Sequence, residues 1–172
     1  MPTLADIQAK LTEELRYVDD VAQIVLKGHL VMEELMSEAL STFLLHEEFL
    51  EPARLQFYQK LNLCRGISTS EHKHNMWNLI GAVNTLRNQL SHSLDPDLRL
   101  KKIESLASTY AQEFPEHLPE KIEGMSRESA ICMMAISGCL GFLHAFLVEI
   151  QRLKGLIISL DKLMNRGELG HA

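Results

Sequence analysis

An arginine and a histidine stand close together in the stretch NTLRNQLSHSLDPD, which covers residues 84–97. Histidine exchanges protons near neutral pH, and arginine presents a planar set of N–H donors to the oxygens of an anion. Arg87 and His92 are therefore a candidate pair for proton transfer beside a bound anionic group. Asn88 stands four residues before His92 and shares its helix face, so we expect it to orient the imidazole or to touch the same ligand.

The spacing of this pair raises a geometric problem. Val83, Leu86 and Leu90 recur at helical spacing, which predicts a buried stripe with Arg87 and His92 off it. Five residues turn a straight α-helix by about 140°, so the two side chains would point apart. They converge only if the helix loosens after Leu90 or if a two-fold axis sets it against its copy. A second interpretation is a helix end, where basic side chains interact with the last carbonyls and the helix dipole without any function.

Other residues of catalytic type are less well arranged. His72 and His74 form an HxH pattern in a polar segment, but no CxxC, HExxH or acidic run accompanies it, so a polar loop is favoured over a metal site. His29 and His144 lie in apolar stretches and are predicted to be hydrogen-bonded packing residues. The sequence also has no glycine-rich phosphate loop. We therefore expect neither a metal nor a cofactor.

Apolar residues recur at helical spacing along the whole chain, and no segment shows a convincing alternation of β-branched residues. The predicted fold is all-α, a helical bundle of about five to six helices with a long C-terminal core helix. A first helix, capped by Thr3, leads into a long element that is continuous, or kinked around Gly28, and ends near Leu45. The remaining helices are predicted from Pro52 to about Leu63, from about Met76 to Leu90, from Pro96 (capped by Asp95) to about Tyr110, and from Ser126 to about Met164.

The final predicted helix has no formally charged side chain over the 19 positions 130–148. That length is close to what spans a bilayer, and Ser137, Gly141 and Ala145 are spaced as in tightly packed membrane helices. The segment lacks flanking aromatic belts and follows amphipathic helices, so a buried core helix is the preferred interpretation. Gly138 and Gly141 are then expected to allow close approach of another helix, within the domain or across a dimer axis.

The composition is ordinary for a globular domain. The 172 residues are 46% hydrophobic and 23% charged, which predicts a single domain, residues 1–172, with a core of its own. The net charge of −6 argues against a broad basic surface that binds duplex DNA. Cys64, Cys132 and Cys139 form no CxxC pair, and the N-terminal segment lacks the blocks of a signal peptide. Reduced thiols and a cytoplasmic location are expected.

The motif RNQLSH, with Arg87, Asn88 and His92, resembles the arginine–polar–histidine signature of the HEPN superfamily, whose members are all-α bundles that often dimerise. The resemblance covers roughly residues 20–110, through GHLVMEELMSEALSTFLL, QFYQKLNLCRGI and the helix that leads into the motif. HEPN toxins paired with nucleotidyltransferases typically place a tyrosine two residues after the histidine, where this chain has Leu94. The pattern also resembles the mannitol operon repressor family, a HEPN-like group regarded as regulatory.

The resemblance implies two alternative functions. In catalytic HEPN members the arginine and histidine form a metal-independent ribonuclease site near the dimer interface, which implies catalytic roles for Arg87, Asn88 and His92. Such a hydrolase would be a toxin or defence effector, and its partners would be RNA, a second copy of the chain and an antitoxin or other protein, with no membrane. The alternative is a non-catalytic helical regulator of transcription that binds a protein or a nucleotide. The acidic net charge favours the regulator, whereas the intact motif favours the ribonuclease.

Overall fold

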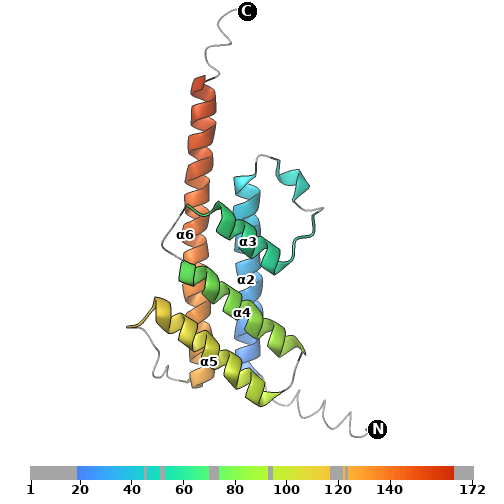
Figure 1. Ribbon diagram of the computed structural model, residues 1–172, viewed down its shortest axis with the longest axis vertical. Helices are drawn as coiled ribbons and strands as arrows, with labels where there is room; N and C mark the ends of the chain where they lie inside the picture. The colour runs from blue at the N-terminus through green and yellow to red at the C-terminus, as the bar shows by residue number, and fades with distance from the viewer. Residues whose placement is uncertain are drawn as a thin grey trace, which may run out of the picture.

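The protein is built from two layers of helices (Figure 1). The computed structural model describes residues 19–44, 46–50, 53–69, 74–92, 95–116, 122 and 124–164. In chain order these contain α2 (Asp20–Phe43), the short 3-10 helix η1 (Glu47–Phe49), α3 (Phe57–Ile67), α4 (His74–His92), α5 (Pro96–Glu113) and α6 (Arg127–Met164). α2 and α6 run side by side in the same direction and make the most extensive contact, while α3, α4 and α5 cross in front of them.

The described residues contain no strand, so the predicted all-α class with a long final helix is confirmed. One hydrophobic core joins residues from α2, α3, α4, α5 and α6. The first predicted helix, after Thr3, lies outside the described residues. What positions the candidate motif is therefore the packing of α4 on the pair formed by α2 and α6.

α2 is held at its start and at its middle by contacts with later helices. Asp19 caps it by accepting a hydrogen bond from the Ala22 backbone N–H at 3.1 Å. The guanidinium of Arg99 on α5 also donates to both Asp19 oxygens, at 2.5 and 2.7 Å. The sequence left open a continuous helix or a kinked pair around Gly28, and the structure shows one helix that continues through Gly28. A Cβ at Gly28 would lie 2.6 Å from Cγ2 of Ile136, which means that the glycine lets α2 and α6 approach closely.

α3 begins later than predicted. Its N-cap is Gln56, whose backbone N–H donates to the Gln59 side chain at 2.8 Å in a capping box. The helix therefore starts at Phe57, and the prediction of a start at Pro52 is wrong; Pro52 itself lies outside the described residues. The helix ends at Ile67, about one turn after the predicted end.

α5 begins where the sequence predicts. Asp95 is the N-cap and Pro96 occupies the first turn, where its missing N–H costs nothing. The Asp95 carboxylate accepts hydrogen bonds from the backbone N–H groups of Asp97 at 3.0 Å and Leu98 at 3.3 Å. α4 and α5 are thus separated only by residues 93–95, and they also pack against each other.

α6 is the central core helix. Ser126 caps it as predicted, because its Oγ accepts a hydrogen bond from the Ser129 N–H at 3.1 Å. Of the described helices, α6 alone is long and apolar enough to cross a membrane. However, 44% of its most apolar 18-residue stretch is buried inside the protein. The core helix of a globular bundle has the same properties. Its buried residues are Ser129, Ala130, Ile131, Cys132, Ala135, Ile136, Cys139, Leu143, Phe146, Leu147 and Ile150.

One expectation about α6 needs correction, and another stays open. The close approach of α2 and α6 occurs at Gly28, whereas Gly138 faces the ring of Phe114, with 3.1 Å between a built Cβ and Cε2, and Gly141 has open space beside it, so close approach there across a dimer axis stays a prediction. His144 is exposed, so its predicted packing role is wrong. The preceding residue, Leu143, belongs to the buried face of α6. Successive residues of a helix point about 100° apart, so His144 points away from the core.

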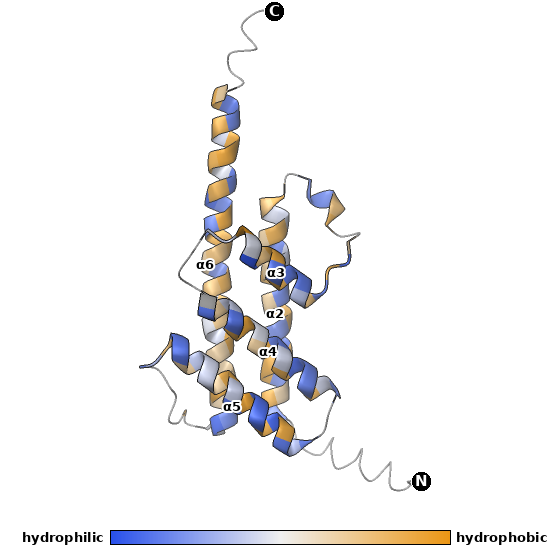
Figure 2. Ribbon diagram, viewed as in Figure 1, coloured by the Kyte–Doolittle hydropathy of each residue, from blue (hydrophilic) through white to orange (hydrophobic). Residues whose placement is uncertain are grey.

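The last part of α6 projects beyond the rest of the bundle (Figure 1). Lys154 donates a hydrogen bond from Nζ to the carbonyl of Leu44, just past the end of α2, at 3.4 Å. Every residue from Gly155 to Met164 is exposed. Hydrophobic and hydrophilic residues alternate along this projecting end, as Figure 2 shows.

Candidate functional site

The three predicted site residues lie on a polar face in the second half of α4. The apolar stripe on the other side of this helix is buried as predicted, and Leu86 has none of its surface exposed. Arg87 is half-buried, whereas Asn88 and His92 are exposed. Ser91 extends the same face, and its hydroxyl donates to the backbone carbonyl of Arg87 at 3.0 Å. The packed stripe therefore fixes which way the polar residues point.

Arg87 and Asn88 are in direct contact. Nη1 of Arg87 donates a hydrogen bond to Oδ1 of Asn88 at 3.2 Å. In the described part of the chain, no carboxylate forms an ion pair with Arg87. The guanidinium thus keeps its positive charge and most of its five N–H donors for an anion. Asn88 was expected to orient His92, but the contact that the structure shows is with the arginine.

Arg87 and His92 do not converge within one copy of the chain. α4 stays helical through His92, so it does not loosen after Leu90. The two residues are separated by a rise of about 7.5 Å and a rotation of about 140°. Of the two routes by which they could meet, only the two-fold axis remains, and it stays a prediction.

The helix-end interpretation explains only part of this arrangement. Arg87 donates to a side chain and not to the last carbonyls of α4. His92 lies in the last turn, where a positive charge would complement the helix dipole. No hydrogen bond from His92 to another described residue is present, so nothing within that part of the chain requires a histidine there.

The polar face extends one turn further back than the sequence indicated. Asn84, three residues before Arg87, pairs with the buried His29 of α2, whose Nε2 donates to Oδ1 of Asn84 at 3.0 Å. The His29 ring also stacks on Phe57, with ring centroids 4.0 Å apart. Burial lowers the pKa of His29, and the charge of Arg87 lowers it further, while Asn84 and Glu33 oppose the shift. His29 is therefore held neutral, and its predicted role as a hydrogen-bonded packing residue is confirmed.

The other predicted candidates do not form sites in the described chain. His72 lies outside it, and His74 is the first residue of α4. The described residues contain no group of three or more histidine, cysteine or acidic side chains that could hold a metal. The cysteines behave as small hydrophobic residues: all three are buried, and burial raises the pKa of the Cys64, Cys132 and Cys139 thiols to about 12.

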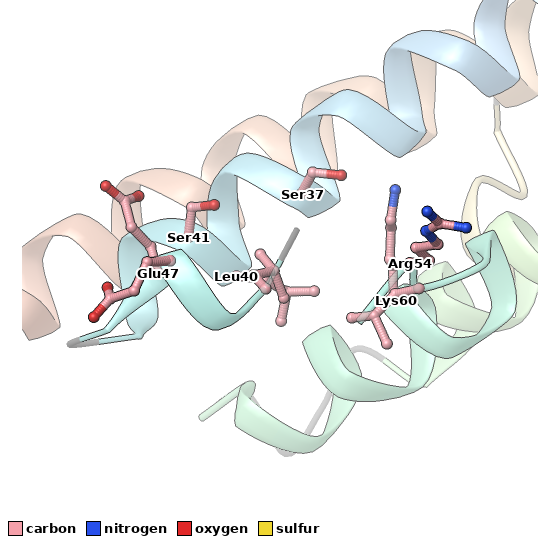
Figure 3. Close-up of a pocket in the computed structure, with 9 residues that line it drawn as sticks. Ser37, Leu40, Ser41, Glu47, Arg54 and Lys60 are labelled. Carbon is pink, nitrogen blue, oxygen red and sulfur yellow. The ribbon is translucent and has the colours of Figure 1, made fainter. Parts of the chain in front are cut away.

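Hollows open elsewhere on the described surface, and in three of them the lining residues do not include Arg87, Asn88 or His92. Of these three, the one with the most charged side chains, of about 570 Å³, lies between α2, η1 and α3. Figure 3 shows Glu47 at one end of it and Arg54 and Lys60 at the other. Lys60 already donates to Glu33 at 2.8 Å, so the charges in this hollow are partly neutralised.

Comparisons with known proteins add no relative: no family model, no curated protein and no solved structure matches this chain. The residues and their geometry are therefore the whole basis for a function.

Proposed function

We propose that the protein is a metal-independent endoribonuclease of the HEPN type, a toxin or defence effector that acts through Arg87, Asn88 and His92. The observation that carries the proposal is the state of Arg87, whose guanidinium has no described carboxylate partner and contacts the Asn88 side chain. His92 stands exposed one turn after Asn88 on the same face. A phosphate-binding cation and a proton-exchanging group are the two parts that such cleavage needs.

The chemistry uses the RNA's own 2′-hydroxyl as nucleophile. The 2′-oxygen attacks phosphorus while a histidine takes its proton, the bond between phosphorus and the 5′-oxygen breaks, and the 5′-oxygen receives a proton. The products are a 2′,3′-cyclic phosphate and a 5′-hydroxyl. Arg87 binds the equatorial phosphate oxygens, whose negative charge grows in the transition state. Asn88 holds the guanidinium in place for that contact.

The divergence of Arg87 and His92 on a straight helix means that one copy is an incomplete site. We propose a homodimer that brings residues 84–95 of two copies together, so that Arg87 of one copy acts with His92 of the other. In each composite site the histidine acts as the base, and the histidinium that it becomes returns the proton to the leaving 5′-oxygen. An antitoxin or other protein partner would inhibit the enzyme by covering this polar face.

A substrate substitution tests the reaction. RNA with a single 2′-methoxy group at the cut site keeps its phosphate but loses the nucleophile, so cleavage should stop at that linkage alone and should persist elsewhere in EDTA. Arg87→Ala and His92→Ala should abolish cleavage. The exposed Arg152 and His144 on α6 provide matched controls, since their alanine variants should cleave as wild type does. Cutting at the substituted linkage, or full activity of both motif variants, would show that the proposal is wrong.

Mixing the two inactive variants tests the shared site. If Arg87 and His92 act across the dimer, half of the randomly formed dimers carry both variants and one of their two composite sites is intact. About a quarter of wild-type activity should therefore return in an equimolar mixture. A site formed within one copy predicts no recovery, and in that case the dimer part of the proposal fails while the ribonuclease part stands.

The regulatory alternative is favoured by a different observation. The motif residues do not line the hollow between α2, η1 and α3, which offers Arg54 and Lys60 opposite Glu47. A helical regulator that binds a protein or a nucleotide would use such a surface without cleaving anything. Protection of this hollow by a ligand, with no cleavage of any RNA tested, would move the preference to that function.

A further inference from the structure

The projecting end of α6 carries an apolar stripe that the protein itself does not cover. Leucines stand at positions 153, 156, 160 and 163, a spacing of three, four and three residues. Ile157 and Met164 add a second column beside them. From Leu156 onward, these stripe side chains are between 50% and 81% exposed. The opposite face carries Arg152, Gly155, Ser159 and Lys162, with Ile158 at its edge, and Asp161 lies beside the second column.

The projecting segment has little of its surface covered by the protein. The hydrogen bond from Lys154 to the Leu44 carbonyl joins α6 to the end of α2, and ten further residues, all exposed, extend about 15 Å beyond it. Because the segment continues α6, it needs no helix nucleus of its own, but its apolar side chains gain no stability from burial within the protein. A partner that covers the stripe would supply that burial.

The stripe continues into an apolar hollow at the base of the projection. The hollow has a volume of about 560 Å³ and is lined by Phe43, Leu44, His46, Phe49, Leu50, Lys154 and Ile157. Phe49 is 71% exposed there. The stripe and the hollow share Ile157, so a single partner can cover both.

We propose that the occupant is a second copy of this chain, bound through antiparallel pairing of the two projecting helices. The stripe is complementary to itself in that direction: Leu153 faces Leu163 of the second copy and Leu156 faces Leu160, so the four leucines form four layers about residue 158. In the same pairing Met164 of the second copy lies at the level of residue 152, just past Lys154, where the hollow opens. A parallel pair would leave the hollow uncovered.

The buried area is consistent with a stable dimer. Seven side chains contribute, namely Phe43, Phe49, Leu156, Ile157, Leu160, Leu163 and Met164. A large apolar side chain loses roughly 60–100 Å² on such burial, which gives about 400–700 Å² for each copy. Both copies together reach the lower range of specific protein interfaces, while the patch itself is as large as the largest found on typical monomers.

This contact is separate from the shared site proposed above. Figure 1 places the projecting end of α6 at one end of the molecule and the end of α4 towards the other. The α6 pairing therefore does not bring Arg87 and His92 together, and it does not depend on the ribonuclease proposal. If both contacts form, the assembly is larger than a dimer, and each contact can be broken independently.

Molar mass in solution tests the pairing. At tens of micromolar, light scattering should show that Leu160→Glu halves the mass of the wild-type assembly, because it puts a charge into a central layer. Ser159→Glu adds the same charge on the polar face and should leave the mass unchanged. Circular dichroism should show both variants folded, since Leu160 is 57% exposed and supports no core residue. Wild type at the monomer mass of 19.5 kDa, or equal masses for Leu160→Glu and wild type, would overturn the proposal.

Cross-linking tests the direction. Leu156→Cys and Leu160→Cys should form a disulfide only when the two variants are mixed, because residue 156 faces residue 160 in the antiparallel pair. Cross-linking of either variant alone would indicate a parallel pair and overturn the arrangement. Sedimentation with phosphatidylcholine vesicles tests whether the stripe binds a lipid surface instead of a second copy. If wild type is monomeric and sediments with the vesicles while Leu160→Glu does not, the occupant is a lipid surface and the pairing proposal is wrong.

Discussion

Replacing Gly28 with alanine should destabilise the protein, although alanine is the better helix former. A Cβ at this position would lie 2.6, 2.8 and 3.2 Å from three side-chain atoms of Ile136, well inside the van der Waals optimum of about 3.5–4.0 Å. Ile136 is buried in the core, and its β-branched side chain strongly prefers one χ1 rotamer in a helix, so it cannot easily swing away. Such overpacking typically costs about 1–3 kcal/mol, and helix propensity returns about 1 kcal/mol. The expected net loss is up to about 2 kcal/mol.

Chemical denaturation followed by circular dichroism measures this loss, and Gly141→Ala is the matched control. Gly141 also lies inside a helix but has nothing within 4 Å of a built Cβ, so alanine there should stabilise by up to about 1 kcal/mol. The double variant Gly28→Ala with Ile136→Ala should be more stable than the sum of the single losses predicts, by about 1 kcal/mol or more, because the new methyl group occupies the vacated space. Equal stabilisation by both glycine replacements, or strict additivity, would refute the close approach of α2 and α6.

Two further predictions concern stability. Burial and the charge of Arg87 hold the pKa of His29 below its ordinary 6.5, so the unfolded chain takes up a proton that the folded chain does not. The unfolding free energy of wild type should therefore fall as pH drops below about 6.5, by at most about 1.4 kcal/mol per pH unit. His29→Gln should remove this slope between pH 7 and 5, and the exposed control His144→Gln should keep it. In thermal denaturation, Leu86→Ala should cost about 2–5 kcal/mol because the side chain is fully buried, whereas Arg87→Ala and His92→Ala should each cost about 1 kcal/mol or less.

The features that sequence predicted well are those set by neighbouring residues. Asp95 and Pro96 mark the start of α5, and Ser126 marks the start of α6, because each acts on backbone groups within the first turn of its own helix. The start of α3 was missed because its cap is a glutamine, which is a less common N-cap than serine or aspartate. His144 was misplaced because an uncharged stretch does not show which side of a helix faces the core.

The features that sequence could not show depend on contacts between distant segments. His29 and Asn84 are 55 residues apart, so the extension of the polar face by one turn appears only when α2 and α4 are packed together. The close approach at Gly28 depends in the same way on Ile136. That Arg87, Asn88 and His92 lie outside the core could be predicted from spacing, because they fall off a stripe that the sequence already marks as buried.

The pairing of α2 with α6 also determines when this chain can fold during its synthesis. Gly28 and Ile136, which meet in the native state, are 108 residues apart, so closing that loop costs about 4 kcal/mol of chain entropy. At 5–20 residues per second, the ribosome needs roughly 5–20 s to make the intervening chain. Throughout that interval the apolar face of α2 has no α6 to cover it. A nascent chain stalled before α6 should therefore expose this face and be a target for chaperones.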